Sequence, residues 1–162
     1  MRALVVSVST RAATGVYDDR TGPLIVESLI AIGFEVEGPR VVPDGPEIES
    51  ILLSAVHDRF DVVITTGGTG ISPTDVTPEH TSAVITRAAP GIAEAVRAAG
   101  AASGVPTAAL SRGVAGIAGP STLIVNLPGS PGGVRDGLRV LEPLLVHAVE
   151  QMHGGGDHQV SS

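Results

Sequence analysis

Short apolar segments alternate with amphipathic segments along almost the whole chain. The apolar segments are rich in β-branched residues, which is typical of buried strands. The amphipathic segments place apolar residues three and four positions apart, which is the spacing of one helix face. Because the two kinds of segment alternate, the sequence predicts an α/β fold with a parallel sheet. The predicted strands are residues 3–9, 34–42, 61–64, 114–119 and 121–127, the last two joined by a turn at Gly119-Pro120.

Prolines mark several predicted helix starts. Proline suits the first position of a helix, where the backbone N–H has no intrahelical partner. Pro23, Pro78 and Pro131 therefore mark three helix starts. Thr77 and Ser130 are the predicted N-caps of the second and third of these helices. The predicted helices are residues 23–33, 47–60, 77 onward, 90–102 and 130–152, and residues 10–20 are predicted to form a polar loop.

The chain of 162 residues has the length of one domain. We expect this domain to cover residues 1–152, followed by a disordered, glycine-rich tail at residues 153–162. No uninterrupted apolar run reaches the roughly 18 residues of a membrane span. The chain does not open with a basic segment followed by an apolar one, as a signal peptide would. The sequence therefore predicts a soluble, cytoplasmic protein that does not bind a membrane.

The composition excludes several kinds of chemistry. The chain has no cysteine, which excludes a thiol nucleophile and a thiolate metal site. Its 10 basic residues are all arginine, which excludes a lysine Schiff base and the lysine of a Walker A loop. The net charge of −7 and the low aromatic content of 2% argue against a nucleic-acid partner. An anionic ligand would therefore be held by local arginines, backbone N–H groups and a metal ion.

The segment TTGGTGISPTDVTPE, residues 65–79, directly follows the predicted strand 61–64. Its glycines allow tight turns and a close approach of the backbone to a ligand. Its hydroxyl groups and the carboxylate of Asp75 suit a phosphate and a divalent cation. The alternative is a loop made only of turn residues. The candidate residues of this segment are Gly67, Gly68, Thr69, Gly70, Ser72 and Asp75.

Four loops are predicted to follow the carboxyl ends of strands, where open α/β sheets bind their ligands. These loops are residues 10–20, 43–46, 67–76 and 128–133. Asp44 lies in the second loop and Asp75 in the third, so the two carboxylates could share a Mg²⁺ ion or orient a phosphate chain around one. The alternatives are a helix N-cap for Asp44 and a turn residue for Asp75.

Two further segments carry groups that suit phosphate. The segment NLPGSPGG, residues 126–133, opens a helix with small residues, so unpaired N–H groups at the positive end of the helix dipole can face an anion. The segment Ser111-Arg112-Gly113 offers a hydroxyl and a guanidinium that forks onto phosphate oxygens. The alternatives are a plain capped helix and, for Arg112, a surface ion pair with a nearby acid. The five histidines show no spacing typical of a metal site.

Together these motifs resemble the molybdopterin-binding domain of molybdopterin adenylyltransferases, which also forms the G domain of gephyrin. The resemblance rests on TTGGTGISPTDVTPE, VPD at 42–44, SRG at 111–113 and NLPGSPGG at 126–133, in this order and spacing. The resemblance covers nearly the whole chain. In order and spacing, the motifs are similar to those of the stand-alone bacterial enzymes of the Mog/MoaB type. It implies a three-layer α/β/α sandwich with a mostly parallel sheet. It also implies a homotrimer, with the alanine-rich segment 90–102 as a plausible contact.

The resemblance implies a nucleotidyltransferase of molybdenum cofactor biosynthesis. In the implied reaction, the terminal phosphate of molybdopterin attacks the α-phosphorus of ATP with Mg²⁺, giving adenylyl-molybdopterin and pyrophosphate. A separate molybdate-inserting enzyme then uses this product. Asp44 and Asp75 match the two functional aspartates of the family, as catalytic and metal-positioning groups. The residues implied to bind the substrates are Gly67, Gly68, Thr69, Gly70, Ser72, Ser111, Arg112, Pro128, Gly129 and Ser130.

The chain departs from the family pattern at two positions. Many members carry arginine where this chain has Thr74, and Ser-Asp-Arg where it has Ser9-Thr10-Arg11. These departures leave open a second interpretation, a carrier or scaffold that holds molybdopterin without adenylylating it. A third interpretation is a nucleotide hydrolase on the same fold, as in competence-damage-type proteins, against which the fit of NLPGSPGG weighs.

Overall fold

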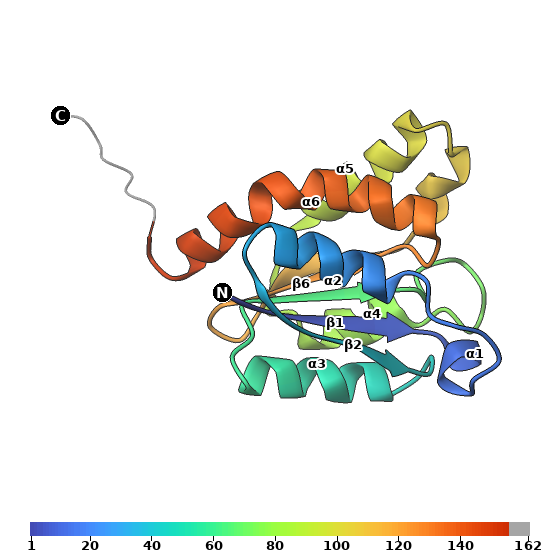
Figure 1. The fold of residues 1–162 in the computed structure, drawn as a ribbon, viewed down its shortest axis with the longest axis horizontal. Helices are drawn as coiled ribbons and strands as arrows, with labels where there is room; N and C mark the ends of the chain where they lie inside the picture. Colours follow the sequence, from blue (N-terminus) through green and yellow to red (C-terminus); the bar gives the residue numbers. More distant parts are fainter. Residues whose placement is uncertain (156–162) are drawn as a thin grey trace.

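The computed structural model describes residues 1–155 as one sheet with helices on both faces (Figure 1). Within these residues, six strands form the sheet in the order β2-β1-β3-β6-β5-β4. The first four strands in this order pair in parallel, whereas β5 runs antiparallel to β6 and β4 antiparallel to β5. The predicted α/β class with a mostly parallel sheet is confirmed. The strands are β1 (Arg2–Val8), β2 (Glu35–Val42), β3 (Val62–Thr66), β4 (Arg87–Ala88), β5 (Ala115–Ala118) and β6 (Thr122–Leu127).

Two layers of helices cover the sheet, which confirms the three-layer sandwich. Because side chains alternate along a strand, β1 is buried on both faces. Val5 belongs to the core between the sheet and the first helical layer. Leu4 and Val6 belong to the core on the opposite face. The first layer contains α2 (Gly22–Ala31), α5 (Pro90–Ala102) and α6 (Pro131–Met152), and the second contains α3 (Glu47–His57) and α4 (Thr77–Val84).

Parallel pairing brings the carboxyl ends of four strands to one end of the sheet. Ser7 of β1 pairs with Thr66 of β3, and Thr66 pairs with Leu127 of β6. Strand β2 ends beside them, since its Val42 pairs with Val8. The four predicted loops therefore leave the sheet at the same end of the molecule. The short helix α1 (Thr10–Ala13) also lies at this end (Figure 1).

The structure corrects the sequence prediction at four places. The predicted loop 10–20 contains α1, whose N-cap Ser9 accepts a hydrogen bond from Ala12 N at 3.2 Å. Thr77 is not the N-cap of α4 but its first residue, and its Oγ1 donates to Gly67 O at 3.0 Å. Strand β4 and the 3-10 helix η1 (Pro106–Leu110) were not predicted, because elements this short show no hydrophobic period.

The last helix agrees with its prediction at both ends. Ser130 caps α6, because its Oγ accepts a hydrogen bond from Gly133 N at 3.1 Å. The helix ends at Met152, and residues 153 and 154 form a turn. The remainder of the predicted tail, residues 156–162, lies outside the described residues, so the domain boundary at residue 152 stays a prediction. Among residues 1–155, no helix is both long and apolar enough to cross a membrane.

Candidate functional site

Two adjoining cavities lie at the carboxyl end of the sheet. The first has a volume of about 850 Å³ and is lined by residues that follow β1, β2, β3 and β6. The second has a volume of about 520 Å³ and lies between the loop 67–76, here called the glycine loop, and helices α5, η1 and α6. Gly68, Asp75 and Gly129 line both cavities, so these three residues form part of a shared wall.

The predicted site residues divide between the two cavities. Asp44 and Gly67 line the first cavity together with the shared wall. Ser72 and Arg112 lie outside both linings, as far as the described residues show. Ser72 is exposed, and its backbone N–H donates to Asp75 Oδ2 at 3.0 Å. The predicted residues that line only the second cavity are Thr69, Gly70, Ser111, Pro128 and Ser130.

The backbone of the glycine loop requires glycine at two positions. Gly67 has a φ of +97° and Gly68 a φ of +61°, values that residues with a side chain rarely adopt. A Cβ atom at Gly67 would overlap Val8 O. A Cβ atom at Gly68 would overlap the hydroxyl of Thr77 and lie 2.8 Å from Asp44 Oδ1. The missing side chain at position 68 therefore lets the Asp44 carboxylate approach the loop.

Asp44 is held in the first cavity by Thr10. Its Oδ2 accepts hydrogen bonds from Thr10 N at 3.1 Å and from Thr10 Oγ1 at 2.9 Å, and its own N–H donates to Thr10 Oγ1 at 3.1 Å. The alternative of an N-cap is not observed, because Pro46 occupies that position of α3 and the described residues show no side-chain cap there. Thr10, which departs from the family pattern, is thus a direct partner of a predicted metal ligand.

Asp75 forms a turn, which was one of its two interpretations, and it also lines both cavities. Its Oδ2 accepts a hydrogen bond from Ser72 N at 3.0 Å, and its N–H donates to Ser72 O at 2.9 Å, which closes a turn. The same residue lines both cavities, and a Cβ atom at Gly70 would lie 2.7 Å from its Oδ2. Thr74 lines the first cavity beside it, with its hydroxyl 3.1 Å from Ser72 Oγ. Asp75 is therefore a turn residue whose carboxylate is available at the shared wall.

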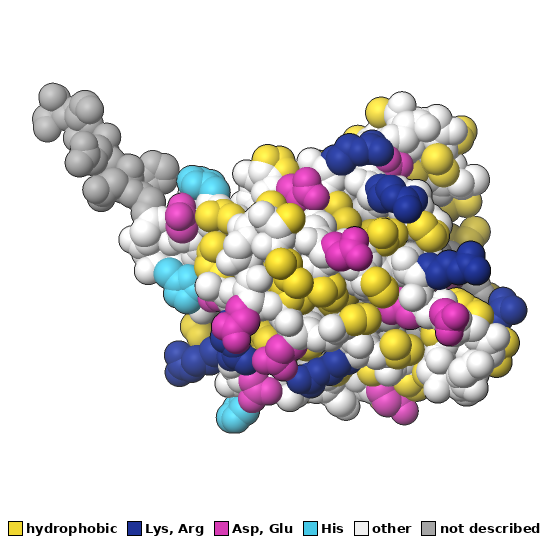
Figure 2. All heavy atoms as spheres, viewed as in Figure 1, with side chains coloured by type: hydrophobic (Ala, Val, Ile, Leu, Met, Phe, Trp, Pro, Cys, Tyr) yellow, Lys and Arg dark blue, Asp and Glu magenta, His cyan; other side chains and the backbone are white. Residues whose placement is uncertain are grey.

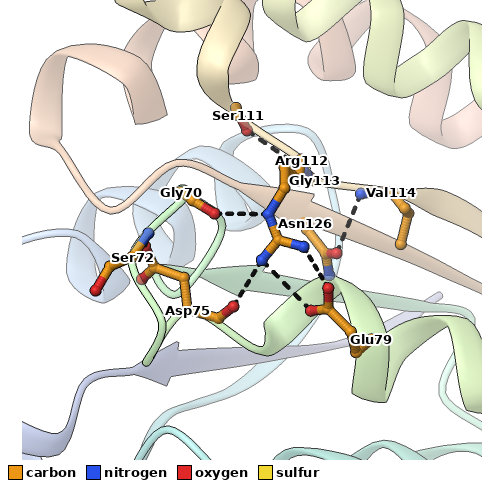
Figure 3. Close-up of polar contacts among 9 residues, drawn as sticks. All are labelled: Gly70, Ser72, Asp75, Glu79, Ser111, Arg112, Gly113, Val114 and Asn126. Carbon is orange, nitrogen blue, oxygen red and sulfur yellow. Dashed lines mark hydrogen bonds and ion pairs between the residues drawn. The ribbon is translucent and has the colours of Figure 1, made fainter.

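Arg112 reaches the glycine loop and helix α4 from the segment before β5 (Figure 3). Its Nε donates to Gly70 O at 2.7 Å and its Nη2 donates to Asp75 O at 2.6 Å. Its Nη1 donates to the carboxylate of Glu79, so the ion pair with a nearby acid is observed. This hydrogen bond from Arg112 holds the pKa of Glu79 below its ordinary value.

Sequence reasoning missed the residues that β1 and the loop after it bring to the first cavity. Arg11 and Arg20 line this cavity and place two positive charges near the carboxylates of Asp19, Asp44 and Asp75. Figure 2 shows basic side chains at the end of the molecule where α1 lies. The available signal was two arginines in a polar loop directly after an apolar strand. The missed residues are Ser7, Ser9, Arg11, Tyr17, Asp19, Arg20 and Thr21.

Asp19 connects this loop to the start of α2. Its Oδ2 accepts a hydrogen bond from Ser7 Oγ at 2.5 Å, and its Oδ1 accepts from Thr21 N and Gly22 N, each at 3.0 Å. Burial alone would raise the pKa of Asp19, but the hydrogen bonds from Ser7, Gly22 and Thr21 outweigh it and hold the pKa below its ordinary value. Asp19 lies two residues before the N-cap Thr21 and is not itself the cap of α2, which has no side-chain capping hydrogen bond among the described residues.

The carboxylates of Asp44 and Asp75 suit a Mg²⁺ ion that the protein and a bound ligand would coordinate together. The described residues contain no group of three or more His, Cys, Asp or Glu side chains that could hold a metal ion. Magnesium, however, is commonly bound by one or two carboxylates together with substrate phosphates and water. Asp44 and Asp75 both line the first cavity, with Asp44 Oδ1 close to Gly68 and Asp75 Oδ2 close to Gly70.

An α/β domain with a glycine loop and two aspartates at the carboxyl ends of its strands has the architecture of a small-molecule-binding α/β protein. Comparison with known proteins identifies the family to which this domain belongs. The family model described as "Probable molybdopterin binding domain" matches residues 4–147. The chain belongs to this molybdopterin-binding domain family, as predicted.

Individual relatives agree with this assignment. The molybdopterin biosynthesis Mog protein from Mycobacterium ulcerans has 55% sequence identity and a TM-score of 0.88, over 93% of this chain and 98% of that chain. The molybdopterin adenylyltransferase of Escherichia coli K12 is 41% identical over 158 residues, which cover 92% of this chain and 80% of that protein. The molybdenum cofactor biosynthesis bifunctional protein of Chlorobaculum tepidum is 33% identical over 156 residues, and the match spans only 49% of its length.

Proposed function

We propose that this protein is an adenylyltransferase of molybdenum cofactor biosynthesis, with molybdopterin and ATP as substrates. A terminal phosphate oxygen of molybdopterin forms a bond to the α-phosphorus of ATP. The bond from that phosphorus to the bridging oxygen breaks, and pyrophosphate leaves. One observation carries the proposal: the two cavities meet at a wall that contains Asp75 together with Gly68 and Gly129. A transfer between two bound substrates needs adjoining sites of this kind.

The sizes of the cavities support binding of two separate ligands. Their volumes of about 850 and 520 Å³ lie within the range of roughly 300–1,000 Å³ that is usual for small-molecule sites. The two organic moieties would extend into different cavities, while the reacting phosphates meet at the shared wall.

The chain supplies groups that position phosphates and does not need a covalent nucleophile. Phosphoryl and nucleotidyl transfers depend mainly on positioning and on charge neutralisation, so the absence of lysine and cysteine is no obstacle. The missing side chains of Gly68 and Gly129 let the shared wall pack closely, since a Cβ atom at Gly68 would overlap Thr77 Oγ1 and one at Gly129 would lie 3.1 Å from Gly67 Cα. The N-terminus of α6, capped by Ser130, lines the second cavity through Gly132 and Gly133 and would attract an anion. Thr69, Gly70, Ser72, Ser111 and Pro128 complete the proposed binding set.

Asp44 and Asp75 are the residues that would hold Mg²⁺. When bound, the ion would neutralise phosphate charge during the transfer. The hydrogen bonds from Thr10 keep Asp44 in the first cavity, and those within the turn of Ser72 keep Asp75 at the wall. The two carboxylates are thus placed before a substrate arrives.

The second candidate is a carrier that binds molybdopterin without turnover. It is favoured by Thr74, which lines the first cavity where many relatives have an arginine. A homotrimer, a molybdate-inserting partner and a cytoplasmic location remain predictions from the family resemblance.

The test measures pyrophosphate release from ATP and Mg²⁺ under anaerobic conditions, with and without molybdopterin. Release only with molybdopterin supports the adenylyltransferase. Bound molybdopterin without release supports the carrier, and release without molybdopterin supports a hydrolase.

A variant pair tests the metal-binding residues in the same assay. We expect Asp75→Asn to lower turnover by about 100-fold, because several kcal/mol of charge stabilisation would be lost. The matched control is Asp58→Asn, since Asp58 is exposed and its carbonyl accepts from Arg2 at the opposite end of the sheet. Normal turnover by Asp75→Asn would refute the metal assignment.

A further inference from the structure

We infer that Arg112 is a positioning residue, which fixes the glycine loop so that Asp75 stays at the wall between the two cavities. It does this without binding a substrate phosphate, and so differs from the role that the family resemblance implies. The inference rests on the proposed function, because its kinetic test uses adenylyl transfer.

All three guanidinium nitrogens of Arg112 donate hydrogen bonds to the glycine loop or to the helix that follows it (Figure 3). Nε bonds Gly70 O at 2.7 Å, Nη2 bonds Asp75 O at 2.6 Å, and Nη1 bonds the Glu79 carboxylate. The guanidinium is planar and rigid, so acceptors bound around it are fixed relative to one another. Arg112 therefore closes the part of the loop between Gly70 and Asp75.

The backbone of Arg112 holds the same loop at a further point. Its N–H donates to Thr69 O at 2.8 Å, next to the residue that its side chain contacts. Asp75 Oδ2 in turn accepts from Ser72 N within the closed loop, at 3.0 Å. The position of the Asp75 carboxylate thus depends on a backbone that Arg112 fixes at Thr69, Gly70 and Asp75.

The segment that carries Arg112 is anchored in the core by Asn126, which is only 3% exposed. Asn126 Oδ1 accepts a hydrogen bond from Val114 N at 3.1 Å. Its Nδ2 donates to Thr65 Oγ1 at 2.9 Å and to Thr81 Oγ1 at 3.0 Å. Figure 3 shows Asn126 beside Val114, on the far side of Arg112 from the loop. Arg112 therefore lies between a segment that is fixed in the core and the loop that it contacts. A positioning residue needs this arrangement.

The positive charge of Arg112 is already balanced by Glu79. The hydrogen bond from Arg112 is the main reason why the pKa of Glu79 lies below its ordinary value, so Glu79 is ionised at neutral pH. Within the described chain, the arginines that line the cavities are Arg11 and Arg20 in the first and Arg97 in the second. Arg112 belongs to neither lining within the residues described.

The kinetic test compares Arg112→Lys and Arg112→Ala with the control Arg87→Ala, which removes an exposed arginine from the edge strand β4. Lysine keeps the charge but cannot make three directed hydrogen bonds. We expect both Arg112 variants to lower kcat by about 10- to 100-fold, since a small displacement of a reacting group can cost this much. The KM values for ATP and molybdopterin should change less than about threefold. Near-normal Arg112→Lys, together with a KM raised about tenfold or more in Arg112→Ala, would mean phosphate binding and overturn the inference.

A double variant tests whether Arg112 acts through Asp75. In the Asp75→Asn background, we expect Arg112→Ala to lower the single-turnover rate by less than about twofold. The full effect of Arg112→Ala in that background would show that Arg112 acts independently of Asp75, contrary to the inference.

Hydrogen exchange of residues 67–76 provides a measurement that does not require turnover. We expect faster exchange there in both Arg112 variants, with unchanged exchange in β3 and with Arg87→Ala like the wild type. Unchanged exchange in the loop would overturn the inference. If exchange in the loop changes in the Arg112 variants but the wild type releases no pyrophosphate, the proposed function is rejected. The positioning role of Arg112 is then still supported.

Discussion

The two loops that contribute most to the first cavity are held in different ways. The glycine loop is bound by residues distant in sequence, including Arg112, whose Nε and Nη2 bond its carbonyls at 2.7 and 2.6 Å. In the loop after β1, the tip formed by residues 14–17 is held by residues close to it in the sequence. Tyr17 OH lies 2.9 Å from Ser9 Oγ, and Thr14 Oγ1 donates to Thr10 O at 2.9 Å. The tip is also open to solvent, with Tyr17 48% exposed.

This difference indicates different tasks for the two loops. Contacts from distant, anchored residues fix a backbone in one conformation, whereas exposed local contacts open at a smaller free-energy cost. The glycine loop therefore suits the placement of reacting groups, and the loop after β1 suits adaptation to a ligand. Among the described residues, the ends of the loop after β1 have partners outside it: Thr10 donates to Asp44, and Asp19 accepts from Ser7 of β1 and from the start of α2.

The largest expected effect comes from a side chain added to the glycine loop. In Gly67→Ala, the new Cβ would overlap Val8 O, and the backbone would keep a φ of +97°. We expect the free energy of unfolding in urea to fall by about 3 kcal/mol and adenylyl transfer to be lost. The matched control is Gly15→Ala in the loop after β1, where φ is +73° but no atom lies within 4 Å of the new Cβ. That control should cost only about 1 kcal/mol, the price of the left-handed backbone alone. Equal losses would contradict the role of the close contact with Val8.

The next effect concerns the anchor behind the glycine loop. Asn126→Ala removes the partner of Val114 N and of the hydroxyls of Thr65 and Thr81. Because these groups are left without a buried partner, we expect the free energy of unfolding to fall by about 2 kcal/mol. Hydrogen exchange of residues 67–76 should also become faster. Ser9→Ala, which removes the cap of exposed helix α1, is the comparison in the other loop and should cost about 0.5 kcal/mol. A stable Asn126→Ala with normal loop exchange would contradict the anchor.

The sequence was sufficient to predict the strand that leads into the glycine loop, the glycines and Asp75. These features are local, because an apolar β-branched run, turn residues and a carboxylate follow one another directly. The position of Asp44 at the same end of the sheet was also predictable, since parallel strands bring their carboxyl ends together.

The role of Arg112 was not predictable in the same way. Its partners are backbone carbonyls 42 and 37 residues away in the chain, and a carbonyl is the same in every residue type. The position of β4 beside β5 was hidden for a related reason, because a strand of two residues has no pattern and is defined only by its pairing with β5. Thr77 was assigned as a cap from its local sequence, whereas its hydroxyl bonds the distant carbonyl of Gly67.

A smaller effect, which depends on pH, is expected at Asp19. Its pKa in the folded protein lies below the ordinary value of 3.8, so the ionised carboxylate stabilises the fold. That contribution is complete above the unfolded-state pKa and is lost as the pH falls through the folded-state pKa. We expect Asp19→Asn to lower the free energy of unfolding by about 1 kcal/mol at neutral pH, a modest value because the group is partly exposed. Urea unfolding should show this difference shrinking as the pH falls below about 4. A difference that grows on acidification would contradict the assignment.

The smallest expected effect is at Thr10, where the loop after β1 meets a predicted metal ligand. Thr10→Val removes the hydroxyl that donates to Asp44 Oδ2 at 2.9 Å and accepts from Asp44 N at 3.1 Å, but it keeps the backbone donor at 3.1 Å, whereas Thr10→Ser keeps all three contacts. We expect Thr10→Val to lower adenylyl transfer by about fivefold, equivalent to about 1 kcal/mol for two exposed hydrogen bonds, with almost unchanged stability. Thr10→Ser should resemble the wild type. If Thr10→Val were fully active, the backbone N–H alone would hold Asp44. The loop after β1 would then act on the chemistry only through its backbone, and the contrast with the side-chain clamp on the glycine loop would become sharper.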